Sequence, residues 1–149
     1  MTGSTLLLSL LALELTAPLP RQPMEVPQGS WVVVAAERDP DLGGNLPERI
    51  IVEFQEKQVR MFTKEGKTLS TFELKTSPMK KPREMMLTTD IGNKKYLLHA
   101  IYLLEKDRLV ICLANALGDA PLNESDRPTE FKAGKHRELL TLEPKRNNE

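Results

Sequence analysis

Few of the residues that carry catalytic or metal chemistry are present in this chain. Its 149 residues include one cysteine, Cys112, and two histidines, His99 and His136. One thiol excludes an internal disulfide and a metal site built from several cysteines. The histidines lie far apart in sequence, which argues against a zinc hydrolase and a histidine-based triad. The motifs G-x-G-x-x-G, H-E-x-x-H and G-x-S-x-G and the phosphate-binding P-loop are missing as well. We therefore expect no enzyme activity, no metal ion and no cofactor.

The chain also lacks an excess of charge of either sign. Lys+Arg and Asp+Glu both number 21, so no net field attracts nucleic acid or an anionic membrane. We interpret the basic run at residues 80–83 (KKPR) as a solvated loop and expect no nucleic-acid partner. A hydrophobic content of 40% beside 28% charged residues predicts a globular domain with a core rather than a disordered chain.

The first residues differ in composition from the rest. Residues 5–13 (TLLLSLLAL) form an uncharged leucine-rich stretch of the length of a signal-peptide core, too short for a stable membrane span. We predict a signal peptide over residues 1–17, and hence an exported protein, periplasmic or extracellular. The alternative is an N-terminal amphipathic helix that packs on the domain of a cytoplasmic protein. Residues 18–27 are rich in proline and are interpreted as a linker.

Short segments with the alternation typical of β-strands follow. In residues 49–55, Ile50, Val52 and Phe54 share one face. Gly66 supplies a hairpin turn, and residues 90–95 are expected to form a loop. Residues 108–114 are apolar on both faces, which indicates a strand covered on both sides. The predicted strands are residues 31–37, 49–55, 58–62, 68–75, 84–89, 96–104, 108–114 and 138–142.

This spacing predicts an all-β fold. About eight strands suit a closed antiparallel up-and-down β-barrel, because closure leaves no strand edge exposed. The barrel is expected to occupy residues 28–143, followed by a charged tail at residues 144–149. A β-sandwich is the alternative.

Four motifs lie along this domain. Residues 29–37 (GSWVVVAAE) open with G-x-W, and residues 82–88 (PREMMLT) form a proline-led strand. Residues 101–114 (IYLLEKDRLVICLA) read I-Y-x-L-x-x-D-x-L-x-x-C-x-A, and residues 127–131 (RPTEF) read R-P-x-x-F. In this order they resemble a family of small lipocalin-like domains expanded in planctomycete bacteria. The resemblance implies a lipocalin-like barrel, often exported, and no defined activity. Lipocalin-like barrels in general bind small apolar ligands, which is an analogy of fold.

Two residues are assigned structural roles. Trp31 of the G-x-W motif is expected in the core at the barrel bottom, with its indole N–H bonded to a nearby carbonyl. In lipocalin-like barrels a late basic residue packs on this tryptophan, and Arg127 is the candidate here. Cys112 is expected to be a buried, inert thiol.

The function classes that remain are a ligand carrier and an interaction module. If an apolar ligand binds, we expect it to enter the barrel and contact Phe54, Met61, Phe72 and Tyr102, which lie at alternating and therefore inward positions. A cavity of ~300 Å³ or more would favour the carrier. A barrel filled by side chains, with apolar groups on its outer surface, would favour a structural or protein-interaction module. The sequence does not address the oligomeric state.

Overall fold

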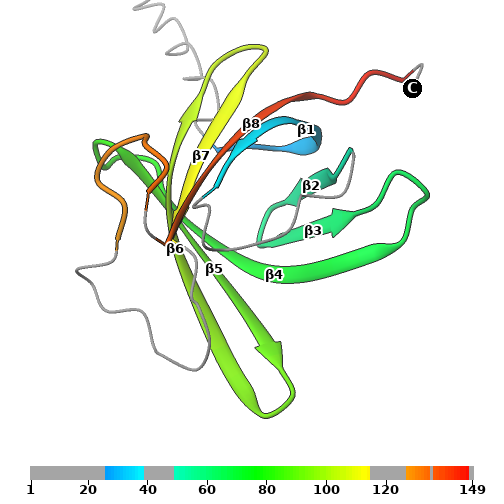
Figure 1. The fold of residues 1–149 in the computed structure, drawn as a ribbon, viewed down its shortest axis with the longest axis horizontal. Coiled ribbons are helices and arrows are strands. Elements are labelled where there is room, and N and C mark those ends of the chain that lie inside the picture. The colour runs from blue at the N-terminus through cyan, green and yellow to red at the C-terminus, as the bar shows by residue number, and fades with distance from the viewer. Residues whose placement is uncertain (1–25, 39–48, 115–126, 135, 148–149) are drawn as a thin grey trace, which may run out of the picture.

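Eight antiparallel strands close into one barrel in the computed structural model, which describes residues 26–38, 49–114, 127–134 and 136–147 (Figure 1). The strands are β1 (Gly29–Glu37), β2 (Ile51–Gln55), β3 (Gln58–Phe62), β4 (Thr68–Ser77), β5 (Arg83–Ile91), β6 (Lys94–Leu104), β7 (Leu109–Ala114) and β8 (Arg137–Pro144). No helix occurs in the described residues. The prediction of an all-β barrel is confirmed, and the sandwich alternative is wrong.

The topology is up-and-down. Each strand pairs with the next one in sequence, and β8 returns to pair with β1, so that no strand of the described barrel is an edge. The pairing of β1 is divided between its neighbours. Residues 29–32 pair with β2, whereas pairing with β8 continues from Trp31 to Glu37 across an irregularity between Val33 and Ala35. Among the described residues, the second half of β1 therefore pairs with β8 alone.

Because successive side chains on a strand point to opposite faces, every second residue points into the barrel, and these inward positions hold the apolar core. Val52 and Phe54 of β2 are buried and lie opposite Met61 and Val59 of β3. The buried core comprises Trp31, Ile50, Val52, Phe54, Val59, Leu74, Met85, Leu87, Ala100, Tyr102, Leu109, Ile111 and Leu142.

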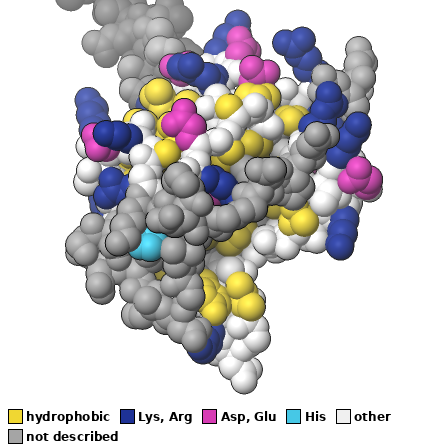
Figure 2. Space-filling model, viewed as in Figure 1, with side chains coloured by type: hydrophobic (Ala, Val, Ile, Leu, Met, Phe, Trp, Pro, Cys, Tyr) yellow, Lys and Arg dark blue, Asp and Glu magenta, His cyan; other side chains and the backbone are white. Residues whose placement is uncertain are grey.

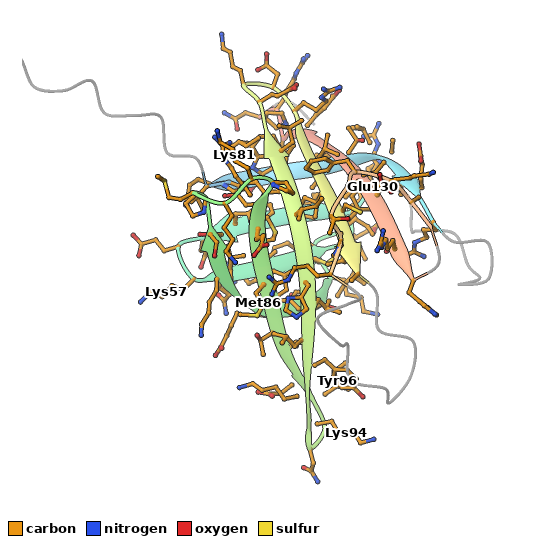
Figure 3. The ribbon with its side chains drawn as sticks, turned by 90° about the vertical axis from the view of Figure 1, so that its left-hand side faces the viewer. Lys57, Lys81, Met86, Lys94, Tyr96 and Glu130 are labelled. Carbon is orange, nitrogen blue, oxygen red and sulfur yellow. The ribbon has the colours of Figure 1, made fainter. Side chains whose placement is uncertain are left out.

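The hairpin of β5 and β6 is longer than the sequence pattern predicted. Residues 90–95 were expected to form a loop, but the strands continue to the pair Ile91 and Lys94. Gly92 takes a positive φ of 63°, which lets a two-residue turn join them. The hairpin projects beyond the barrel, with Lys94 at its tip (Figure 3).

Residues 127–134 cover the outer face of β6 and β7. Pro128 is fully buried, and the Cys112 thiol lies 3.6 Å from the Lys132 carbonyl oxygen. Ile101 and Cys112 point outward and are nevertheless only 1% and 0% exposed. The prediction that β7 is covered on both sides is confirmed.

The predicted signal peptide and nearly all of the predicted linker lie outside the described residues. Within the described ranges, no helix has the length and apolar character needed to cross a membrane.

Candidate functional site: an apolar cavity in the barrel

A small cavity lies inside the barrel. Its volume is about 100 Å³, and apart from Arg38 and Glu138 its lining is apolar. The lining residues come from all eight strands and the adjoining chain: Val33, Arg38, Ile50, Val52, Phe54, Val59, Met61, Phe72, Met85, Leu87, Leu98, Ile111, Leu113, Glu138, Leu140 and Leu142. Side chains fill most of the rest of the interior. The cavity is therefore well below the ~300 Å³ that would favour a ligand carrier.

Three of the four residues predicted to contact a ligand line this cavity. Phe54, Met61 and Phe72 come from the adjacent strands β2, β3 and β4. Tyr102 does not line it. Tyr102 is 1% exposed and pairs with Arg83, the first residue of β5, so it lies near the opposite end of the barrel. The alternation predicted the inward direction of Tyr102 but not its level along the barrel axis.

An ion pair borders the cavity at its outer end. Arg38 Nε donates a hydrogen bond to Glu138 Oε1 over 2.7 Å. Glu138 is 4% exposed, although it carries a carboxylate into the barrel. A buried charge is costly unless it is paired, and Arg38 supplies the partner. Neither residue is among the site residues predicted from the sequence. Glu138 has the same phase as the inward residues Leu140 and Leu142, and that signal could have found it.

Trp31 fills the other end of the barrel. Its side chain is 6% exposed, and its indole Nε1–H donates to the Gln28 carbonyl oxygen over 2.9 Å. Gly29 takes a positive φ of 79° between them, which turns the preceding chain back toward the ring. This is the core position and the indole hydrogen bond that the G-x-W motif led us to expect.

Arg127, which was expected on the Trp31 ring, contacts other partners. Its guanidinium lies 3.2 Å from Glu84 Oε2 and 3.4 Å from His99 Nδ1. Glu84 precedes the inward Met85 on β5, so it points outward, as does His99 on β6. The barrel wall thus separates Arg127 from the indole, and a carboxylate offers it stronger, charge-assisted hydrogen bonds.

The lone thiol is buried. Burial raises the pKa of Cys112 above its ordinary value, which lowers the fraction of the nucleophilic thiolate further. Among the described residues, no group of three or more His, Cys, Asp and Glu side chains could hold a metal ion.

The fold and the cavity together define an eight-stranded antiparallel barrel with a small apolar chamber that is closed at the Trp31 end. No protein-family model, curated protein or solved structure matches this chain.

Proposed function

We propose that the barrel binds a compact apolar group in its interior cavity. The observation that carries this proposal is the lining: aromatic, methionine and branched aliphatic side chains surround a cavity of about 100 Å³, with polar groups only at its outer end. Ligand pockets typically combine apolar walls with a few polar groups that orient the ligand. Arg38 and Glu138 would take that orienting role for a polar group at the mouth.

The volume limits the ligand. Drug-sized pockets measure roughly 300–1,000 Å³, whereas engineered apolar cavities of ~150 Å³ stay dry and bind benzene or xenon. The interior therefore suits a single ring or a short branched alkyl group. A larger ligand would have to leave its remaining atoms at the mouth, beside the ion pair.

Two features of the sequence support an exported carrier. The leucine-rich stretch in residues 5–13 supports a signal peptide, and the four motifs support membership of the lipocalin-like family. If the protein is exported, intact-mass measurement on material from the native host should show the loss of about 15 or more N-terminal residues. A full-length product would instead favour the packed N-terminal helix.

A pair of leucine variants tests the cavity. Fluorobenzene observed by ¹⁹F NMR should bind with a dissociation constant of about 1 mM, since so small a ligand buries little area. Leu98 lines the cavity, and Leu97 is 39% exposed on the outer face of the same strand. Leu98→Trp fills the cavity and should abolish binding. Leu97→Trp adds the same indole outside and should leave binding unchanged.

The small cavity also favours a second candidate, a protein-interaction module with a filled barrel. Figure 2 shows hydrophobic side chains gathered toward the middle of one face, with Lys and Arg side chains mostly around them. The large apolar side chains exposed on the described surface are Val34, Leu69, Met79, Ile91, Leu97 and Leu103. If neither fluorobenzene nor xenon binds the wild-type protein, the interior is only a core and this second candidate leads.

A further inference from the structure

A larger groove lies on the outside of the barrel, near the Trp31 end. The chain connecting β4 to β5, the end of β6 and Phe131 of the covering segment form a hollow of about 590 Å³. This volume is several times that of the interior cavity and lies in the range of typical small-molecule sites. The groove shares no lining residue with the cavity, so the two can be tested separately.

The floor of the groove is apolar. Leu103 from β6 and Phe131 from the covering segment contribute their side chains, whereas Tyr102 and Leu104 border the groove with side chains that pack in the barrel core. Leu103 remains 40% exposed and Met79 in the β4–β5 connection 85% exposed, although both are large hydrophobic residues. An unbranched alkyl chain laid along this floor would remove their surface from water. Methionine adapts its shape to such a chain because its side chain is unbranched and flexible.

The charges at the groove are all positive. Lys80, Lys81 and Arg83 line it, and none of its described lining residues is acidic. Lys80 Nζ lies 3.0 Å from Glu84, so that ammonium is already paired. Lys81 is exposed on the β4–β5 connection, at the end of the molecule away from the β5–β6 hairpin tip (Figure 3). An apolar floor beside this ammonium is complementary to a ligand with an alkyl chain and a negative head.

We propose that this groove binds an anionic amphiphile, a carboxylate carried on an alkyl chain of medium length. The carboxylate pairs with Lys81, and the chain covers Leu103, Phe131 and Met79. Lys81 is too exposed for its charge alone to hold a ligand, so the apolar contact supplies most of the affinity and the ammonium selects the anion.

Decanoate, kept below its micelle concentration, is the probe, and isothermal titration to the full-length protein measures its binding. We expect saturable binding that weakens about tenfold in Leu103→Ser, because the apolar contact is lost. Leu97→Ser is the matched control: Leu97 lies on the same strand and is 39% exposed, but it does not line the groove. It should leave the dissociation constant unchanged.

Charge is tested in the same way. Lys81→Glu should weaken decanoate binding about fivefold or more, whereas Lys94→Glu, at the hairpin tip, should not. Decanol, which lacks the anion, should bind the wild type several times more weakly than decanoate. The cavity-filling variant Leu98→Trp should bind decanoate normally, so failure of the interior site would not be mistaken for failure of the groove.

Several outcomes would overturn the proposal. These are absence of saturable binding, equal binding of decanol and decanoate, or equal losses in Leu103→Ser and Leu97→Ser. A dimer of the wild type that dissociates in Leu103→Ser without decanoate would assign the groove to a second copy of the chain instead.

Discussion

The Arg38 guanidinium and the Glu138 carboxylate meet over 2.7 Å, although one hundred positions separate them in the sequence. The contact joins the chain that leaves β1 to the start of β8. The two partners are unequally exposed, because the Arg38 side chain is 29% accessible and the Glu138 side chain only 5%. Removal of Arg38 and removal of Glu138 should therefore change the stability of the protein by different amounts.

We expect Arg38→Ala to destabilise the protein more than Glu138→Ala. Arg38→Ala leaves a buried carboxylate unpaired, at a cost of ~2–3 kcal/mol, whereas Glu138→Ala leaves an arginine that can reach water, at a cost of ~1 kcal/mol. Urea unfolding of both variants measures the difference. The double variant Arg38→Met with Glu138→Leu should regain most of the stability. Equal losses in the two single variants would show that burial of Glu138 is not the governing factor.

Trp31→Ala should lower the free energy of unfolding by ~3–5 kcal/mol, as other large core truncations do. Trp31→Phe keeps most of the apolar volume and loses the hydrogen bond to the Gln28 carbonyl, so it should cost only ~1–2 kcal/mol. Thermal melts of both variants provide the measurement. If the thermal melt of Trp31→Ala coincides with that of the wild type, Trp31 does not stabilise the end of the barrel as proposed.

Arg127→Ala should loosen the segment that covers Cys112. Arg127 holds the start of this segment to Glu84, and Lys132 further along it contacts the thiol. We expect a loss of ~1 kcal/mol, since the ion pair is partly exposed, and severalfold faster labelling of Cys112 by a thiol reagent.

Arg108→Ala is the control for this variant. It removes an exposed pair with Glu105 in the connection between β6 and β7, so it should leave the labelling rate unchanged. Identical labelling rates in Arg127→Ala and the wild type would contradict the assigned role of Arg127.

The pKa of Glu53 is lowered, chiefly by its hydrogen bond from Arg60 over 2.7 Å. The pKa of Glu53 is lower in the folded protein than in the unfolded chain. The pair therefore stabilises the protein at pH values above the pKa of Glu53 in the unfolded chain. That contribution to stability is lost as the pH falls through the pKa of Glu53 in the folded protein. The pair is partly exposed, so it should amount to less than ~1 kcal/mol. Carboxyl titration by NMR should show a higher Glu53 pKa in Arg60→Gln, and an unchanged pKa would contradict the assignment to Arg60.

The sequence by itself determined the strands and the faces of most side chains. Alternation is a local property of an extended backbone, so Phe54, Met61 and Phe72 could be assigned inward positions without knowledge of their neighbours. Gly66, with a φ of 87°, likewise marks a turn whose requirement is local.

The tertiary structure alone decided how these residues meet. Whether the barrel is hollow depends on the volumes of side chains from eight strands and on how far each strand is shifted against the next. That shift placed Tyr102 beyond the cavity, and it brought Arg38 to Glu138. Arg127 contacts Glu84 and His99 because the covering segment crosses the outside of β5 and β6. Alternation along a strand determines which side of the barrel wall a residue faces. Which distant residues lie at the same level along the barrel axis is determined only when the barrel closes, because that level depends on strand pairing along the whole chain.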